Sequence, residues 1–285
     1  MADRRALLAE SWSAAAAVYE RQLVPRFAAW TSAALAELRR HPLPSRGGIV
    51  VPCCGVGQEV EALAVQHPDR AVTGVDLSPG MVAAATARLA AAGLSGRARA
   101  VVGDAAELDP ALLPAAALLS CFGLQQLAPS PGPARALAAW VRGLSPGGVA
   151  VVCFWPERAE ATGPWAVFEA ALQADAPRAA DAADAAASWA EDVTGTASRF
   201  ADMLRNELIA HEMAWPSADE FWEVMTRGGP WAARRLKLGD AHMDGLKARW
   251  LAAGGFDARA PLAHSPCARH ITLRRRRSCD GVSAL

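Results

Sequence analysis

IVVPCCGVGQE, residues 49–59, is the stretch that decides the fold of this 285-residue chain. It begins as a short apolar run of the kind found in buried strands, and it continues into a turn at Gly55 and Gly57. These two glycines permit positive φ and let the backbone pass close beneath a ligand. The helix expected after Gly57 adds free N–H groups and a positive dipole end, which favour an anionic group. A phosphate and a carboxylate both fit this description.

Two further apolar runs lead to acidic residues, Asp76 and Asp104. A carboxylate in the position of Asp76 accepts two hydrogen bonds from a ribose diol. Asp104, one strand further out, is placed to accept from an exocyclic amine such as that of adenine. A dinucleotide would need a third glycine where Val60 stands. A ligand that places a ribose diol at Asp76, an adenine at Asp104 and a carboxylate at the glycine turn would be S-adenosylmethionine.

Strands and helices alternate between residues 48 and 154. The expected strands are 48–53, 70–76, 97–103, 115–121 and 148–154, and the expected helices are 57–66, 79–92 and 131–144. This alternation requires parallel strands joined by right-handed crossovers, so we predict an α/β, doubly wound sheet. Near the C-terminus, residues 256–262 and 267–273 are expected to form a strand pair with a short connection, which makes the last strand antiparallel.

The rest of the chain is expected to surround this sheet. Residues 1–45 have amphipathic helical spacing, residues 200–211 place apolar side chains at helical intervals, and a capping box starts at Ser217. We therefore divide the chain into an N-terminal helical lid (1–45), a cofactor-binding α/β core (46–155), a helical cap inserted for the substrate (156–238), the end of the core with a helix and the antiparallel strand pair (239–277), and a tail (278–285).

Composition narrows the class of partner. The chain carries 29 basic and 29 acidic residues, so no overall charge attracts nucleic acid or an anionic membrane surface. We expect no membrane span and no signal peptide, because no apolar run is long enough for a bilayer and the N-terminus lacks an apolar segment. The six cysteines include no CxxC pair, so we expect no metal site, and their apolar contexts indicate a reducing, cytoplasmic compartment.

The chain resembles the class I S-adenosylmethionine-dependent methyltransferases, in particular their small-molecule, ubiquinone/menaquinone-methyltransferase-like group. The segments that carry the resemblance are VVPCCGVG (50–57), TGVDLSPGM (73–81), VGDA (102–105), LSCFGLQQL (119–127) and LSPGG (144–148). They occur in the family's order. The resemblance implies a Rossmann-like, seven-stranded, mostly parallel sheet. It also implies S-adenosyl-L-methionine as the cofactor and S-adenosyl-L-homocysteine as the product.

The resemblance also implies a set of cofactor-binding residues at the ends of the strands. They are Cys53, Cys54, Gly55, Gly57, Asp76, Leu77, Met81, Gly103, Asp104, Ala105, Ser120, Cys121 and Gln125. Two positions depart from the family pattern: Val51 stands where an acid is usual, and Cys53 stands where the first motif glycine is usual. Because that acid helps to orient the glycine turn, we expect a compensating group from Glu59 or from the N-terminal helices.

The acceptor is expected above residues 120–126, beneath the lid and the cap. Six of the ten tryptophans fall at positions 155, 165, 189, 215, 222 and 231. Such an aromatic wall suits a flat or cationic acceptor, and core packing of the cap is the alternative. The expected substrate residues are Phe122, Gln126, Trp165, Trp215, Trp222 and Trp231. Tyr19 is the expected lid residue and His211 the candidate base, with a helix-surface and a structural role as their respective alternatives.

We predict transfer of a methyl group, by direct in-line displacement, to O, N, S or C of a small molecule. The donor is already activated, so the protein supplies alignment and a dry pocket. The Asn-Pro-Pro-aromatic motif used for nucleic-acid bases is absent at residues 120–123, which favours a free metabolite. We expect a monomer or homodimer. The alternatives are a non-catalytic cofactor-binding or scaffold protein of the same fold, and an aminopropyl-type transferase, which would want acids at residues 120–126.

Overall fold

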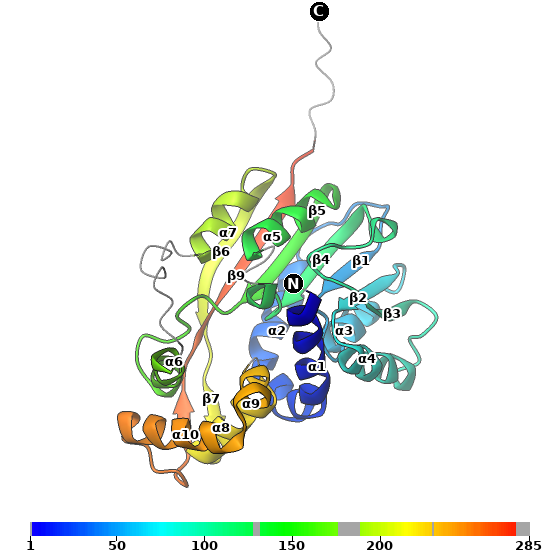
Figure 1. Cartoon of the computed structure of the whole chain (residues 1–285). Coiled ribbons are helices and arrows are strands. Elements are labelled where there is room, and N and C mark those ends of the chain that lie inside the picture. Colours follow the sequence, from blue (N-terminus) through cyan, green and yellow to red (C-terminus); the bar gives the residue numbers. More distant parts are fainter. Residues whose placement is uncertain (1, 128–131, 176–188, 230, 278–285) are drawn as a thin grey trace, which may run out of the picture.

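A seven-stranded sheet forms the centre of the molecule (Figure 1), with strands in the order β3-β2-β1-β4-β5-β9-β6. The computed structural model describes residues 2–127, 132–175, 189–229 and 231–277, and the tail predicted at 278–285 lies outside them. The strands of the sheet are β1 (Ile49–Pro52), β2 (Val72–Asp76), β3 (Ala98–Val102), β4 (Ala115–Cys121), β5 (Leu144–Phe154), β6 (Ala201–Ala210) and β9 (Cys267–Arg275).

Strands β1 to β5 pair in parallel, as the alternation of strands and helices predicted. Strand β9 pairs antiparallel with β5 on one side and with β6 on the other. The predicted seven-stranded, mostly parallel sheet with an antiparallel last strand is therefore confirmed. Because β1 to β5 run in one direction, their carboxyl ends meet at one edge of the sheet, which is where ligands bind in folds of this class.

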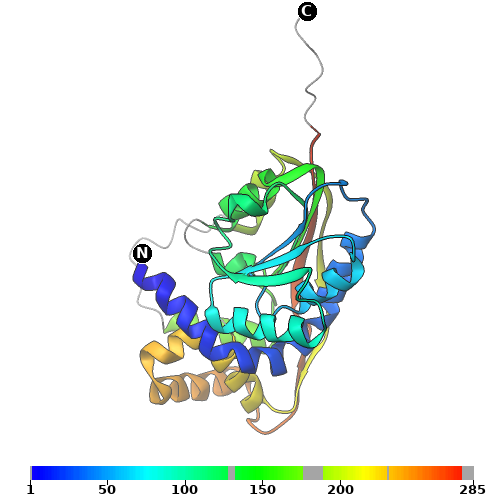
Figure 2. The ribbon, with the colours of Figure 1, turned by 90° about the vertical axis from the view of Figure 1, so that its right-hand side faces the viewer.

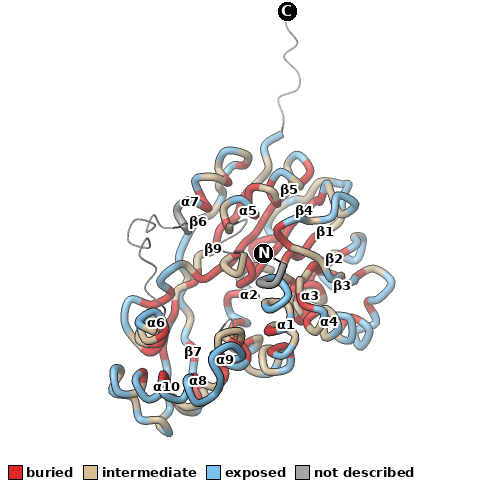
Figure 3. Tube along the Cα trace, in the orientation of Figure 1, coloured by how far each residue is buried: buried red, intermediate tan, exposed pale blue. Residues whose placement is uncertain are grey.

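Helices cover both faces of the sheet. Those on one face are α2 (Val24–Arg39), α3 (Gln58–Gln66) and α4 (Pro79–Ala91), and those on the other are α5 (Pro133–Arg142) and α7 (Trp189–Ala197). Within β1, Ile49 and Val51 belong to the apolar cluster of α2 and α3, whereas Val50 belongs to that of α5. The strand is buried on both sides (Figure 3), which explains why it is apolar at every position.

Two short turns flank strand β4. The 3-10 turn η3 (Leu124–Leu127) follows β4 at the carboxyl edge, whereas the 3-10 turn η2 (Pro110–Leu112) comes just before β4 starts, at the opposite edge. The turn η3 carries residues that the sequence assigned to the ligand site.

One helical segment precedes the sheet. Helix α1 (Ala2–Val18), a π-helical turn η1 (Tyr19–Leu23) and α2 follow one another directly. The N–H of Val24 donates to the carbonyl of Tyr19, and Pro25, which has no N–H, falls in the first turn of α2. Helix α1 packs beside α4 (Figure 2), where the N–H of Gly80 donates to Ser13 Oγ at 3.1 Å. The π turn thus sets the direction in which α1 leaves the sheet.

A second group of elements lies beyond the carboxyl edge of the sheet (Figure 1). It consists of α6 (Pro164–Ala174), α8 (Ala218–Arg227), α9 (Ala232–Leu238), α10 (Asp240–Gly254) and the strand pair β7 (Met213–Trp215) and β8 (Leu262–His264). Trp222 and Trp250 are fully buried in its interior, with ring centroids 5.6 Å apart. We call this group of elements the cap. It differs from the predicted cap of residues 156–238, because it includes α10 and β8, which were assigned to the end of the core, and excludes α7 and β6, which pack on or belong to the main sheet.

A buried hydrogen-bond chain holds the strand pair of the cap to the start of α6. The indole N–H of Trp215 donates to His264 Nε2 at 2.9 Å. His264 Nε2 is therefore an acceptor, so its Nδ1 carries the proton and donates to Glu160 Oε1 at 2.6 Å. The other carboxylate oxygen of Glu160 accepts the backbone N–H of Trp165 at 3.0 Å. This chain fixes the backbone from which the Trp165 side chain projects.

Two sequence predictions are wrong in this half of the chain. Residues 200–211, predicted as a helix, contain strand β6, which forms the edge of the main sheet against β9. The apolar residues that suggested a helix face include Leu204 and Leu208, which are 43% and 62% exposed. Their helical spacing therefore did not indicate a buried helix face. The predicted pairing of 256–262 with 267–273 does not form either, because β8 pairs with β7 while β9 joins the main sheet.

The arginine run at the end of β9 makes contacts within the chain. Arg274 Nη2 lies 3.2 Å from His41 Nδ1, and Arg276 Nε donates to Asp202 at 2.9 Å. The run therefore behaves as a charged strand end. Within the part of the chain that the structure describes, no helix is both long and apolar enough to cross a membrane.

Candidate functional site

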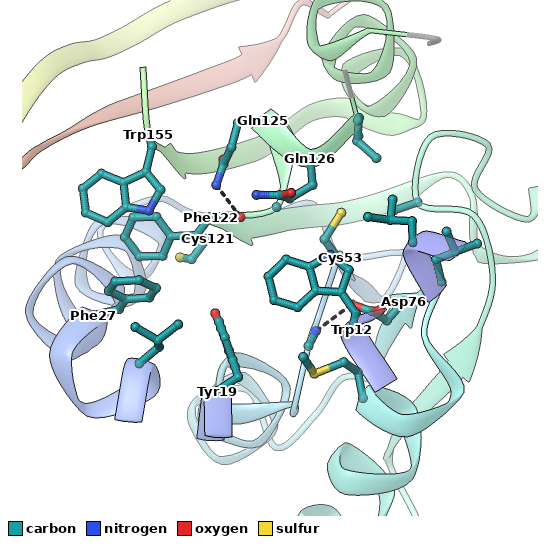
Figure 4. Close-up of a pocket in the computed structure, with 18 of the residues that line it drawn as sticks. Trp12, Tyr19, Phe27, Cys53, Asp76, Cys121, Phe122, Gln125, Gln126 and Trp155 are labelled. Carbon is teal, nitrogen blue, oxygen red and sulfur yellow. Dashed lines mark hydrogen bonds between the residues drawn. The ribbon is translucent and has the colours of Figure 1, made fainter. Parts of the chain in front are cut away.

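A cavity of about 340 Å³ opens between the carboxyl edge of the sheet, the N-terminal helices and the cap. Fourteen of the residues expected from the sequence line it, namely Tyr19, Cys53, Gly55, Asp76, Leu77, Met81, Asp104, Ala105, Cys121, Phe122, Gln125, Gln126, Trp165 and Trp231. Ten further lining residues were not named individually as site residues, although Gly123 falls within the expected stretch 120–126 and Trp155 is one of the six tryptophans of the expected aromatic wall. The ten are Leu8, Trp12, Leu23, Phe27, Gly123, Leu127, Trp155, Pro156, Glu169 and Met225. Figure 4 shows a polar end at Asp76 and an aromatic end at Trp155.

The glycine turn after β1 forms the floor of the polar end. Its backbone is left-handed at Cys53 (φ 54°), Gly55 (φ 51°) and Gly57 (φ 82°). A Cβ on Gly57 would lie 2.7 Å from the Cβ of Ala85, so this glycine is required by helix packing and does not itself line the cavity. Cys53 adopts a conformation that usually selects glycine, which explains why the family pattern has glycine there.

Asp76 ties this turn to the end of β2. Its Oδ2 accepts the N–H of Gly55 at 2.9 Å, and its Oδ1 accepts the N–H of Ser78 at 3.0 Å. Burial raises the pKa of Asp76, and these backbone donors oppose the rise. Each carboxylate oxygen keeps a second acceptor site. Asp76 therefore has two roles available, since it holds the glycine turn and also faces the cavity.

One carboxylate oxygen of Asp104 is paired with an arginine of helix α1. Its Oδ1 accepts the N–H of Ala106 at 2.8 Å, and its Oδ2 lies 2.9 Å from Arg5 Nη2 of α1. The Arg5 side chain is 51% exposed, so the ion pair contributes little to stability. A ligand amine that reaches Asp104 would have to share this carboxylate with Arg5.

Tyr19 lies in the middle of the cavity wall. It belongs to the π turn η1, its ring stands 5.8 Å from that of Trp12 and 6.3 Å from that of Phe27, and its hydroxyl points into the cavity (Figure 4). Burial, and secondly the carboxylate of Glu59, raise the pKa of the Tyr19 hydroxyl. The phenol therefore stays protonated and is a hydrogen-bond donor toward a ligand.

The thiols at the cavity are protonated as well. Burial raises the pKa of Cys53 and Cys121 well above the usual value for a thiol, and nearby carboxylates, Asp76 for Cys53 and Glu59 for Cys121, add to the effect. A protonated thiol is a poor nucleophile and a poor metal ligand. Among the described residues, no group of three or more His, Cys, Asp or Glu side chains is arranged to hold a metal ion.

Glu59 is buried in the first turn of α3. It is 4% exposed and accepts from Gln58 Nε2 at 3.1 Å and from Thr31 Oγ1 at 3.5 Å. Burial raises the pKa of Glu59 to about 7. Glu59 does not line the cavity, and its hydrogen bonds link the first turn of α3 to Thr31 of α2.

Aromatic rings line the other end of the cavity. Phe122 and Trp155 stack at 4.6 Å and 23°, Phe27 lies 4.7 Å from Phe122, and Trp165 lies 4.8 Å from Trp155. Phe122 has φ 59°, an unusual value for a bulky residue, and its N–H donates to the carbonyl of Cys153 at 2.7 Å. The left-handed backbone at Phe122 turns its ring toward the cavity at the end of β4.

Glu169 is the one carboxylate at the aromatic end among the described lining residues. It lies on α6, and its Oε1 accepts the indole N–H of Trp165 at 2.9 Å. Burial raises the pKa of Glu169 to about 7, while the hydrogen bond from Trp165 opposes the rise. No local motif marks this residue, because its place depends on how α6 packs over the sheet.

Several predicted residues do not line the cavity. They are Cys54, Gly57, Gly103, Ser120, His211, Trp215 and Trp222. Ser120 Oγ donates to the carbonyl of Pro52 at 2.9 Å and so links β4 to β1. Trp222 is fully buried among the cap helices, where it packs on Phe168 and Trp250. Ser120 and Cys121 are adjacent in strand β4, so only Cys121 faces the cavity.

His211 lies away from the cavity, in the connection between β6 and β7. Its ring packs edge-on against Trp30 at 4.9 Å. The change of 200–211 from helix to strand moves this residue to the end of an edge strand. The prediction of His211 as a base at the cavity is therefore not supported by its position.

The residues of the polar end fit S-adenosylmethionine. Gly55 bears only hydrogen where a Cβ would point at Tyr19, 3.8 Å away. Asp76 offers acceptors for a diol, and Asp104 and Ala105 lie further along the wall, where an adenine would bind. The N-terminus of α3 follows the turn and offers backbone N–H groups toward a carboxylate. The donor set thus matches the three polar parts of this cofactor.

Comparison with known proteins agrees with this fit. Residues 49–148 match the family model described as a methyltransferase domain. A search of curated proteins finds no match. Among solved structures, an S-adenosylmethionine-dependent methyltransferase from Geobacter sulfurreducens, in complex with S-adenosyl-L-homocysteine, is 18% identical, with 86% of this chain and 90% of that chain covered and a TM-score of 0.50.

A second solved structure has the same arrangement of elements. It is a proposed sarcosine dimethylglycine methyltransferase from Galdieria sulphuraria, which is 13% identical, with 90% of this chain and 88% of that chain covered and a TM-score of 0.51. At these identities the likeness concerns the fold alone. The family match and the cavity together identify residues 49–148 as a class I S-adenosylmethionine-dependent methyltransferase domain, with S-adenosylmethionine as its cofactor.

Proposed function

We propose that this chain transfers a methyl group from S-adenosylmethionine to a small-molecule acceptor bound at the aromatic end of the cavity. The observation that carries the proposal is the division of one cavity into a polar end at Asp76 and an aromatic end at Trp155 and Trp165 (Figure 4). The cofactor residues expected from the sequence at the polar end, and the ubiquinone/menaquinone-like grouping, are part of this proposal.

The cofactor supplies a methyl group on a positively charged sulfur. The chain's own residues bind and orient the cofactor and the acceptor, and they exclude water from the cavity. Asp76 binds the diol, the N–H groups of the turn and of α3 bind the carboxylate, and Tyr19 closes the wall between the two ends. The aromatic rings of Phe122 and Trp155 hold the acceptor in a dry environment, so that alignment contributes most of the rate.

The volume of the cavity favours a small acceptor. About 340 Å³ is at the small end of ligand cavities, and the N-terminal helices and the cap both line it. A nucleic-acid strand or a protein surface would need an open groove. The expected tryptophan cap is supported in part, because Trp165 and Trp231 line the cavity whereas Trp215 and Trp222 are packed inside the cap.

A labelling experiment tests this proposal. The purified protein is incubated with S-adenosylmethionine carrying a tritiated methyl group and with a cell extract that has been separated into small molecules, proteins and nucleic acids. We expect label in the small-molecule fraction, and little of it with Asp76→Asn. Label that appears only in the protein or nucleic-acid fraction would refute a small-molecule acceptor. Absence of transfer to any fraction would favour the non-catalytic alternative.

A further inference from the structure

Glu169 has no part in cofactor binding or in the methyl-transfer function proposed above. It lies on α6 at the aromatic end of the cavity and is hydrogen-bonded by Oε1 to the indole N–H of Trp165 at 2.9 Å. Trp165 in turn lies 4.8 Å from Trp155, and Trp155 stacks on Phe122 at 4.6 Å. This chain of contacts leads from the end of β4 to Glu169, so the carboxylate is at the acceptor end.

Two indole rings accompany this carboxylate. Trp231 also lines the cavity, and its ring centroid lies 6.3 Å from that of Trp165. Indole faces attract cations, and a carboxylate binds an ammonium group by charge-assisted hydrogen bonds. The indole N–H of Trp165 takes up one acceptor site, on Oε1 of Glu169. A carboxylate has about four acceptor sites in total. Glu169 therefore keeps acceptor capacity for a ligand.

The charges of the cavity wall have one sign. Among the described residues that line it, the ionisable carboxylates are Asp76, Asp104 and Glu169, and there is no Lys, Arg or His. Arg234 borders an adjacent cavity together with Glu169, but its guanidinium is bound to Asp175 at 2.8 Å and to the carbonyl of Leu172 at 2.9 Å. Two cations lie outside this wall: Arg158, whose charge opposes the rise that burial causes in the pKa of Glu169, and Arg234, whose buried Nε has no partner among the described residues. Because neither lines the cavity, a carboxylate or phosphate on the acceptor would face only carboxylates there, whereas a cation would find attraction.

We propose that the methyl acceptor carries an ammonium group, which binds to the carboxylate of Glu169 and against the indole rings of Trp165 and Trp231 and so positions the acceptor in the cavity. This inference deepens the proposed function and rests on it, because it assigns a class of acceptor to the same cavity. It also gives Glu169 a role in specificity, since an acceptor without a positive charge leaves this carboxylate unpaired in an apolar wall.

Three probes of matched shape test the charge preference. They are phenethylamine, 2-phenylethanol and 3-phenylpropionate, which are cationic, neutral and anionic at pH 8. Each is titrated by calorimetry into the full-length protein that has first been saturated with S-adenosylhomocysteine. We expect phenethylamine to bind about tenfold or more tightly than 2-phenylethanol, and 3-phenylpropionate to bind most weakly.

Glu169→Gln provides the second arm, because glutamine keeps the size of the side chain and an acceptor for Trp165. We expect the variant to lose the preference for phenethylamine and to bind 2-phenylethanol as the wild type does. Glu207→Gln, on the exposed edge strand β6, is the control and should leave all three affinities unchanged.

The outcomes separate this inference from the proposed function. Saturation with S-adenosylhomocysteine is measured first, and failure at that step contradicts the proposed function itself. Normal saturation with no preference for phenethylamine, including no binding of any probe, overturns the ammonium inference alone. Tighter binding of 3-phenylpropionate, or an unchanged preference in Glu169→Gln, overturns it as well. The wild-type probe series decides between the charge classes even if the variant does not fold.

Discussion

Glu59→Gln tests whether burial keeps the carboxyl group of Glu59 protonated in the folded protein. Burial raises the pKa of Glu59 to about 7 in the folded protein, against about 4.3 in an unfolded chain. Between these two values the unfolded state has released the proton and the folded state retains it, so stability falls as the pH rises. At about 1.4 kcal/mol for each unit, ionisation of Glu59 lowers the free energy of unfolding by roughly 4 kcal/mol at pH 8.

The assay is urea unfolding of wild type and Glu59→Gln at about pH 5 and pH 8. At pH 8 the variant should be more stable than the wild type by up to about 4 kcal/mol, and at pH 5 by only about 1 kcal/mol. Glu61→Gln is the matched control on the same helix, because Glu61 is partly exposed and pairs with Arg88 at 3.1 Å. A difference that does not depend on pH, or an equal effect in the control, would refute the reasoning.

Three more predictions follow from the cavity and the cap. Gly123→Ala places a Cβ 2.2 Å from the Cβ of Cys53, so it should lower stability by about 1–3 kcal/mol; Cys53→Gly in the same protein should restore most of the loss in a double-mutant cycle. Glu160→Ala removes the acceptor of two buried N–H donors, on His264 and Trp165, so the unfolding free energy should fall by about 2–6 kcal/mol, and an unchanged thermal midpoint would contradict this role. Phenethylamine affinity should rise between about pH 6 and pH 8, because Glu169 ionises around its raised pKa of about 7 while the amine stays protonated in this range. The same rise in Glu169→Gln would show that another group titrates.

The sequence predicted the polar end of the cavity well because its residues are placed by local rules. Parallel strands end at one edge, so residues directly after β1, β2 and β4 had to meet there. Asp76 and Phe122 follow from this rule, and so does Trp155, which comes directly after β5. Applying the rule to β5 as well would have added Trp155 to the expected site.

The cap was harder to predict, because its residues reach the cavity only through packing between distant segments. Glu169 is a single acid on an apolar helix and has no signal in its neighbourhood. Trp165 and Trp222 look equivalent in the sequence, yet Trp165 lines the cavity and Trp222 is enclosed by other cap helices. Strand β6 was mistaken for a helix because edge strands leave apolar side chains such as Leu208 exposed, which removes the two-residue alternation.

Val51 and Cys53 depart from the family pattern for different reasons. Val51 is 1% exposed and belongs to the apolar cluster beneath α2 and α3, so an acid there would be buried among apolar side chains. Cys53 keeps the left-handed backbone of the usual glycine and places a protonated thiol at the cavity. The turn therefore retains its left-handed shape, with Asp76 accepting the N–H of Gly55.

Calorimetric titration of S-adenosylhomocysteine into wild type and Asp76→Asn tests the central claim most directly. We predict one binding site in the wild type. We predict binding at least about tenfold weaker in Asp76→Asn, because the variant loses charge-assisted hydrogen bonds to the diol. No binding to the wild type at millimolar ligand, or equal affinity in the two proteins, would contradict the assignment of the polar end to the cofactor.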